Sequence, residues 1–179
     1  MIIALTGEKL SGKGTTAQYL AEHYQATVYR FSKILSDILE RLYQANSRAN
    51  LVTLGTAVRT AFGDDILAQV LFRDIERNRS DHLVVIDGLR YIDEWNIVAQ
   101  LPNIHLWYIV APLELRYHRL QQRTEKVDER SMTWDEFKRR EQDVTEQGIT
   151  ALRPLARYHI DNTGSFTDLY NQIDQAVKQ

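Results

Sequence analysis

The chain has 179 residues, of which 44% are hydrophobic and 26% are charged, so it can bury one core but is short for two domains. Its 22 Lys and Arg residues nearly balance 24 Asp and Glu residues, and the net charge of −2 argues against a nucleic-acid or membrane-surface partner. The lack of cysteine excludes disulfides and cysteine-ligated metals, and no apolar run reaches the roughly 18 residues of a membrane span. We therefore expect a single cytoplasmic domain covering residues 1–179.

Short apolar runs alternate with segments of helical spacing along the chain. Runs of strand length occupy residues 2–6, 27–31, 83–87, 106–110 and 158–161. Helical spacing is clear over 15–24 and over 165–177, where Ser165 is a candidate N-cap. Parallel neighbours in a sheet need a crossover connection, which a helix supplies. The sequence therefore predicts an α/β fold of three layers, in which helices cover both faces of a parallel sheet.

A glycine-rich loop follows the first predicted strand and reads GEKLSGKGT from Gly7 to Thr15. Glycines leave room for backbone amides to wrap around phosphate oxygens, and the helix that follows adds unpaired N–H groups and the positive end of its dipole. We expect Lys13 to reach the β- and γ-phosphates of a nucleotide. The alternative is an ordinary glycine-rich turn. The candidate phosphate-binding residues are Gly7, Lys9, Ser11, Gly12, Lys13, Gly14, Thr15 and Thr16.

Gly14 stands where most such loops carry the hydroxyl that coordinates magnesium, and Thr15 and Thr16 follow it. This GKGT form resembles adenylate kinases and their relatives. The resemblance implies a P-loop NTPase fold with a five-stranded parallel sheet, and ATP and Mg²⁺ as cofactors. In that family phosphates and water hold most of the ion, and Thr15 is a candidate to lie beside it. The chain lacks the guanine-reading NKxD motif, which argues against a GTPase switch.

The run 83–87 ends in Asp87, which Gly88 and Arg90 follow. In a doubly wound sheet this carboxylate emerges at the carboxyl edge beside the phosphate loop, where it can orient water on Mg²⁺. The alternative is a simple Asp-Gly turn after a strand. DGLR resembles the DGxR segment of dephospho-coenzyme A kinases and phage deoxynucleoside monophosphate kinases. That resemblance implies catalytic roles for Asp87 and Arg90 near the transferring phosphates.

About fifty residues separate the second and third predicted strands, more than a crossover helix requires. We expect a helical acceptor-binding insertion over about 32–80. Residues 48–65 resemble the RxxLxxLGTxxRxxxGxD pattern of phage-type deoxynucleoside monophosphate kinases, which implies that Ser32, Arg48 and Arg59 face the acceptor together with Arg90. The bland alternative makes Ser32 a helix N-cap and the arginines surface cations. The adenylate-kinase STGDxLR arginine is missing, which argues against AMP as the acceptor.

Arg116, Arg119 and Arg123 recur at three- and four-residue intervals, which puts them on one helix face. Arg119 and Arg123 resemble the RxxxR start of the lid in nucleotide kinases, which implies that Arg119 packs on adenine and Arg123 contacts the transferring phosphates. A short lid would follow over about 124–140. Asn162 and Gly164 resemble the segment that cradles adenine. The alternatives are a solvated arginine stripe and a turn before an N-cap.

These patterns together predict ATP- and Mg²⁺-dependent phosphoryl transfer to a small phosphorylated acceptor, a nucleoside or deoxynucleoside monophosphate. Lys13, Arg90 and Arg123 would supply charge and Asp87 would organise the metal. One alternative is dephospho-coenzyme A kinase or another small-molecule kinase with a hydroxyl acceptor. The other is an ATP-binding regulatory module that hydrolyses slowly. The sequence does not indicate an oligomeric state.

Overall fold

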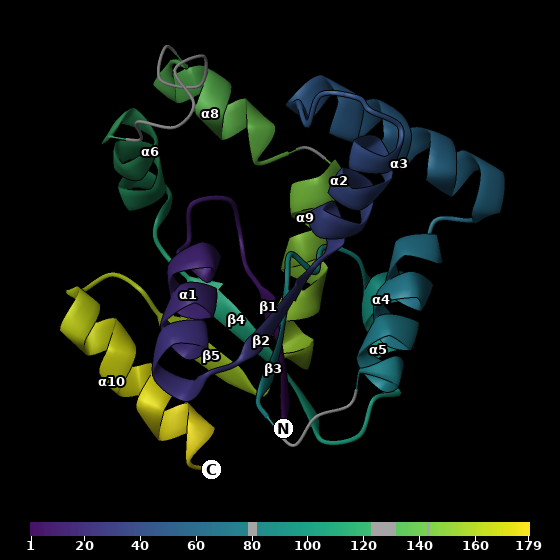
Figure 1. The fold of residues 1–179 in the computed structure, drawn as a ribbon. Helices are drawn as coiled ribbons and strands as arrows, with labels where there is room; N and C mark the ends of the chain where they lie inside the picture. Colours follow the sequence, from purple (N-terminus) through teal and green to yellow (C-terminus); the bar gives the residue numbers. More distant parts are fainter. Residues whose placement is uncertain (79–81, 123–131, 143) are drawn as a thin grey trace.

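The computed structural model describes residues 1–78, 82–122, 132–142 and 144–179 (Figure 1). The first half of the chain forms β1 (Ile2–Thr6), α1 (Lys13–Tyr24), β2 (Thr27–Arg30), α2 (Phe31–Arg41), α3 (Arg48–Phe62), α4 (Ile66–Arg77) and β3 (Val84–Asp87). The second half forms α5 (Ile92–Val98), β4 (Ile104–Val110), α6 (Leu113–Gln122), α8 (Trp134–Arg140), α9 (Val144–Leu152), the 3-10 turn η1 (Arg153–Leu155), β5 (Tyr158–Asp161) and α10 (Phe166–Val177). No helix among the described residues is both long enough and apolar enough to cross a membrane.

The five strands form one sheet in the order β2-β3-β1-β4-β5, and every neighbouring pair is parallel. The central strand β1 pairs Leu5 with Asp87 on one side and Thr6 with Tyr108 on the other. All five carboxyl ends therefore lie along one edge. The segments that leave this edge, including the glycine-rich loop after β1, are brought together although they are far apart in the sequence.

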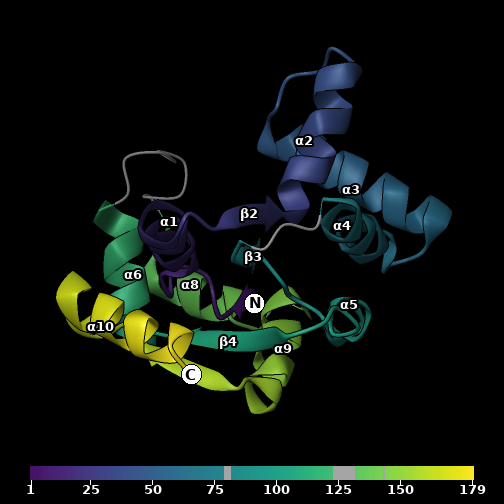
Figure 2. The same cartoon turned by 60° about the horizontal axis from the view of Figure 1, so that its bottom comes forward.

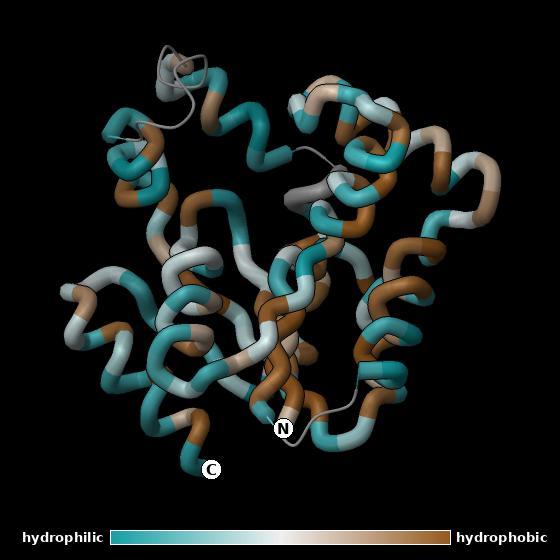
Figure 3. The backbone as a smooth tube through the Cα atoms, viewed as in Figure 1, coloured by the Kyte–Doolittle hydropathy of each residue, from teal (hydrophilic) through white to brown (hydrophobic). Residues whose placement is uncertain are grey.

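Alternation along the strands builds two cores. On β1, Ile3 and Leu5 face a core with Leu20 of α1 and Leu169 of α10, while Ile2 and Ala4 face the helices α2, α4, α5 and α9. Figures 1 and 2 show helices on both sides of the strands, and apolar residues line the strands in Figure 3. The predicted three-layer α/β fold with a five-stranded parallel sheet is therefore confirmed.

Small differences from the predicted elements arise at their ends. β4 begins at Ile104, two residues before the predicted run, and α1 begins at Lys13 rather than at residue 15. β2 ends at Arg30, because Phe31 already belongs to α2 and packs in the core below it. The described residues between β2 and β3 fold mainly as α2, α3 and α4. α2 begins against the sheet, with Phe31 and Leu35 in the core, and α3 stands away from the sheet (Figures 1 and 2).

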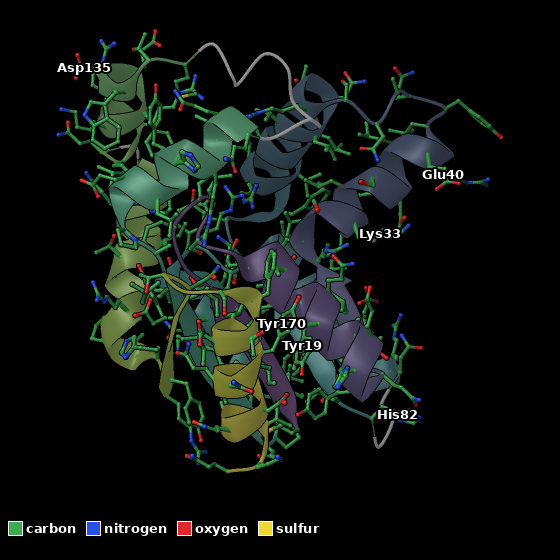
Figure 4. All side chains as sticks on the ribbon, turned by 90° about the vertical axis from the view of Figure 1, so that its left-hand side faces the viewer. Tyr19, Lys33, Glu40, His82, Asp135 and Tyr170 are labelled. Atoms are coloured by element: carbon green, nitrogen blue, oxygen red, sulfur yellow. The ribbon has the colours of Figure 1, made fainter. Side chains whose placement is uncertain are left out.

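The last helix is capped at its start and contacts α1 farther along. Ser165 accepts a hydrogen bond from the amide of Asp168, and the Asp168 carboxylate accepts from the Ser165 amide, which forms a capping box. Farther along, Tyr170 stacks on Tyr19 of α1 with ring centroids 4.0 Å apart (Figure 4). The hydroxyls of Tyr19 and Tyr24 both donate to Asp174. The predicted N-cap at Ser165 is thus confirmed.

We expect Ser165→Ala to lower the free energy of unfolding by about 1 kcal/mol, because one amide of the first turn of α10 loses its acceptor. Thr167→Ala, at an exposed position inside the same helix, is the matched control. Urea denaturation followed by circular dichroism measures both variants. Equal stability of the two variants would show that the cap contributes nothing measurable.

Candidate functional site

The glycine-rich loop leaves β1 and passes so close to its neighbours that two positions strongly favour glycine. Gly7 has φ 135°, and a Cβ there would lie 2.3 Å from the carbonyl oxygen of Ile109. Gly12 has φ 112°, and a Cβ there would lie 2.0 Å from Nδ2 of Asn162. Both φ values fall where side chains are strained. The loop is thus pressed between the ends of β4 and β5.

The carbonyl oxygens of five consecutive loop residues, 7–11, each accept a hydrogen bond from a side chain. Lys13 Nζ donates to the carbonyls of residues 7 and 8 at 2.5 and 2.9 Å. Arg116 donates to residue 9 at 3.3 Å, and Arg119 donates to residues 10 and 11 at 3.1 and 3.2 Å. Asn162 Nδ2 adds a second bond to residue 11, at 2.7 Å. These four side chains bind the negative ends of the loop peptides.

Because each peptide group carries its amide opposite its carbonyl, holding the carbonyls turns the loop amides toward the opposite side, where an anion could bind them. The Ser11 amide is an exception, since it donates to the Glu8 carbonyl at 3.1 Å. The start of α1 adds to this, since the first amides of a helix have no partner within it. The first turn of α1 carries no acidic side chain and no side-chain cap. The buried hydroxyls Ser11 Oγ and Thr16 Oγ1 also have no hydrogen-bond partner in the described part of the chain. The loop fits a phosphate group.

Arg119 and Asn162, which the sequence places at the base end of a nucleotide, meet beside the loop. Arg119 Nη2 donates to the carbonyl of Asn162 at 2.7 Å, and burial lowers the pKa of the guanidinium. Gly164 lies instead against the side chain of Asp168, within the turn that caps α10. The structure thus places Gly164 in the turn before α10 and joins the other two residues to the loop.

Arg123 lies outside the described residues, as do residues 124–131 of the predicted lid. The described part of that segment includes α8, which packs on α6 through Leu120, Met132 and Phe137. Leu10 of the loop packs against the same apolar cluster. Arg116, the first arginine of the stripe, is buried rather than solvated.

Asp87 lies at the carboxyl end of β3, directly opposite Arg30 of β2 in the sheet register. Arg30 Nε donates to Asp87 Oδ2 at 3.1 Å, and the side chains are 52% and 16% exposed. The segment after Asp87 is held beside β1, because Thr6 Oγ1 donates to the carbonyl of Leu89 at 2.9 Å. Sequence reasoning missed Arg30; its place at the end of a predicted strand is a signal that could have identified it.

Arg59 and Arg90 converge on a carboxylate that the sequence analysis did not single out. Glu94 is 3% exposed and accepts from the amides of Arg90 and Tyr91 at 3.0 and 3.3 Å. Arg59 Nη2 lies 3.6 Å from Glu94 Oε1. Burial raises the pKa of Glu94, against the opposing effect of these donors. Arg59 therefore ties α3 to the start of α5.

The remaining predicted acceptor residues lie on exposed helix starts. Ser32 is in the first turn of α2 and its carbonyl accepts from Ser36, while Arg30, not Ser32, is the N-cap. Arg48 begins α3 after the N-cap Ser47. Beside them lies a cleft of ≈ 390 Å³ between β2, α2 and α4. Its lining consists of Val28, Tyr29, Arg30, Lys33, Ile34, Asp37, Leu71, Asp74 and Asn78.

The loop also carries a carboxylate, Glu8, which accepts a hydrogen bond from a side chain of β4. Glu8 Oε1 accepts a 2.6 Å hydrogen bond from the hydroxyl of Tyr108 on β4. Burial and this contact raise the pKa of Tyr108, so the hydroxyl stays protonated. Among the described residues no cluster of three His, Asp or Glu side chains could hold a metal ion. The two residues predicted to lie beside a magnesium ion, Asp87 and Thr15, are both partly buried.

No protein-family model matches the sequence. A UPF0200 protein of Methanosarcina acetivorans is 30% identical over 168 residues, which cover 93% of this chain and 87% of that protein. The chain belongs to the UPF0200 family. A UPF0200 protein of Sulfurisphaera tokodaii is 27% identical over 180 residues, with 99% and 96% of the two chains covered.

Solved structures similar to this member of the UPF0200 family show its fold. TT1252 from Thermus thermophilus superposes with a TM-score of 0.66 at 22% identity, covering 99% and 96% of the two chains. Shikimate kinase from Bacteroides thetaiotaomicron gives 0.63 at 13% identity, covering 99% and 97%. A gluconokinase from Sinorhizobium meliloti gives 0.57 at 11% identity, covering 98% and 90%. The fold is therefore that of P-loop kinases.

The loop geometry predicts opposite outcomes for two neighbouring glycines. Gly12→Ala should lower the free energy of unfolding by about 1–3 kcal/mol, because the methyl group strains the backbone and displaces Asn162. Gly14→Ala should leave stability unchanged or raise it, since a Cβ there meets nothing within 4 Å and alanine favours a helix. Thermal unfolding measures both. A stable Gly12→Ala variant would mean that the loop is not held as described.

Proposed function

We propose that the protein is an ATP- and Mg²⁺-dependent kinase that transfers a phosphoryl group to a small phosphorylated acceptor, a nucleoside or deoxynucleoside monophosphate. The observation that carries the proposal is the set of side-chain bonds to carbonyls 7–11, because it turns loop amides other than that of Ser11, and the start of α1, toward a site for phosphates. In this proposal residues 1–179 act as one domain, with the acceptor insertion over about 32–80 and the lid over about 124–140.

The donor side uses the loop and its neighbours. Lys13 lies 2.5–2.9 Å from two loop carbonyls, so when phosphates enter it exchanges these neutral acceptors for a stronger charged one. Arg119 and Asn162 are joined at the edge of the loop, where the guanidinium face is suited to stacking on a base. We place ATP here, with Thr15 and Asp87 beside the magnesium ion. When bound, Mg²⁺ neutralises charge on the phosphates.

The acceptor side favours a substrate that is already an anion. A hydroxyl acceptor benefits from a carboxylate that removes its proton. Two carboxylates at the carboxyl edge of the sheet are engaged, Asp87 with Arg30 and Glu8 with Tyr108. An acceptor phosphate needs no base, and positioning plus charge neutralisation suffices. We therefore propose that Arg30 and Lys33 of the cleft bind the acceptor together with Ser32, Arg48, Arg59 and Arg90. Arg90 and Arg123 would also supply positive charge to the transferring phosphates.

A screen of acceptors tests the proposed function. ADP release from ATP and Mg²⁺ is measured with each common ribo- and deoxyribonucleoside monophosphate, with dephospho-coenzyme A, and with shikimate and gluconate as hydroxyl acceptors. We expect at least one monophosphate to stimulate ADP release and to yield a diphosphate product. If only a hydroxyl acceptor stimulates ADP release, the proposed monophosphate acceptor is wrong and the protein is a kinase of hydroxyl groups. Binding of ATP without stimulation by any acceptor would favour the regulatory module.

Lys13→Ala should reduce turnover by about 10³-fold or more, because it removes a charge that stabilises the transferring phosphoryl group. The fold should remain, since the side chain is only partly buried at the start of α1. Steady-state kinetics and far-UV circular dichroism check the two expectations. Activity within tenfold of the wild-type value would remove Lys13 from the reaction.

Arg119→Ala should raise the KM for ATP about tenfold while kcat is largely kept, because the lost contacts act before and during transfer alike. Arg119→Lys restores a charge but not the planar fork that reaches two loop carbonyls and Asn162 at once. We expect it to rescue little of the ATP affinity. A wild-type KM in the alanine variant would return Arg119 to a surface role.

A further inference from the structure

Arg116 of α6 joins three parts of the molecule within one buried guanidinium. Its Nε donates to the carbonyl of Ala111 at the end of β4, at 3.1 Å. Its Nη1 donates to the loop carbonyl of Lys9 at 3.3 Å. Nη1 and Nη2 also bind both carboxylate oxygens of Glu141, directly after α8, at 2.9 and 2.5 Å. The sheet, the phosphate loop and α8 are thus linked through one side chain.

Glu141 neutralises the buried positive charge of Arg116. The Arg116 side chain is 5% exposed and that of Glu141 is 23% exposed. A guanidinium stays protonated at any relevant pH, so without its carboxylate it would remain charged, buried and without its bidentate partner. It would then shift toward water or another acceptor. Among its hydrogen bonds to described residues, the one to the Lys9 carbonyl is the longest, so we expect such a shift to weaken it first.

A second contact connects the same two parts. Leu10, the loop residue after Lys9, packs with Leu120, Met132 and Phe137 in the cluster between α6 and α8. Phe137 of α8 also lies under the guanidinium, with its ring centroid 5.9 Å from Arg116 Cζ. The loop segment 9–10 is therefore in contact with the α8 region through both a polar and an apolar path.

We propose that Arg116 is a positioning residue that couples the docking of α8 to the conformation of the phosphate loop, with Glu141 holding it in place. When α8 is docked, Arg116 keeps the Lys9 carbonyl turned away from the phosphate side. Such coupling is reciprocal, so a loop that is filled with phosphate also favours docked α8. The inference rests on the proposed function only in taking ATP as the ligand of the loop.

Glu141→Gln tests the coupling, because it keeps the shape of the side chain and removes its charge. Asp135→Asn is the matched control: it removes one carboxylate charge from α8 itself, where Asp135 is 83% exposed and contacts Lys138. Figure 4 shows Asp135 at the outer end of α8. Amide hydrogen exchange of the loop peptide covering 7–16, relative to a β1 peptide, is measured without ligand. The ATP dissociation constant is measured by calorimetry.

We expect Glu141→Gln to speed exchange in the loop about tenfold while β1 is unchanged, and to weaken ATP binding about tenfold. Arg116→Lys should behave alike, and Asp135→Asn should match the wild type. If exchange becomes faster throughout the chain and the ratio of loop exchange to β1 exchange stays the same, the ion pair only stabilises the fold. That result would overturn the inference. If the wild type phosphorylates no acceptor, the proposed function fails, but hydrogen exchange in the loop still tests whether Glu141 is coupled to the loop. If the wild type is active and Glu141→Gln matches it in both readouts, the inference alone fails.

Discussion

A loop that binds phosphate through its backbone must keep its own carbonyl oxygens away from the anion. In this protein side chains from three other elements meet that requirement at residues 7–11: Lys13 of α1, Arg116 and Arg119 of α6, and Asn162 after β5. The sheet order makes this possible, because β4 and β5 lie on one side of β1, and their carboxyl ends lead into α6 and Asn162. The remaining features of the site follow from the position of this loop.

The positive side chains around the loop need partners of opposite charge or carbonyl acceptors. Two arginines of α6 lie against the loop, and their contacts in the described part of the chain include carbonyl groups and the carboxylate of Glu141. Two carboxylates at the same edge are also paired, Asp87 with Arg30 and Glu8 with Tyr108. The electrostatic potential at the carboxyl edge therefore depends on these individual pairs of side chains and not on the net charge of the chain, which is only −2.

The sequence predicts the parts of the site that are local and leaves out the parts that depend on sheet order. Strands 2–6 and 158–161, the glycine-rich loop and the Ser165 cap each follow from neighbouring residues. The spacing of Arg116 and Arg119 also places them correctly on one helix face. Periodicity does not show that Arg116 is buried, because its partners Lys9 and Glu141 are 107 and 25 residues away. The pairs Arg30–Asp87 and Tyr108–Glu8 are missed for the same reason.

Crystal structures of the protein without ligand and with ATP and Mg²⁺ would test most directly whether the loop is formed before the phosphates arrive. We expect the backbone of residues 7–13 to differ by less than about 1 Å between the two. The carbonyls of residues 9–11 should keep Arg116, Arg119 and Asn162 as donors, while Lys13 moves to the phosphates. A loop whose carbonyls turn away from these donors when ATP binds would contradict a preformed site.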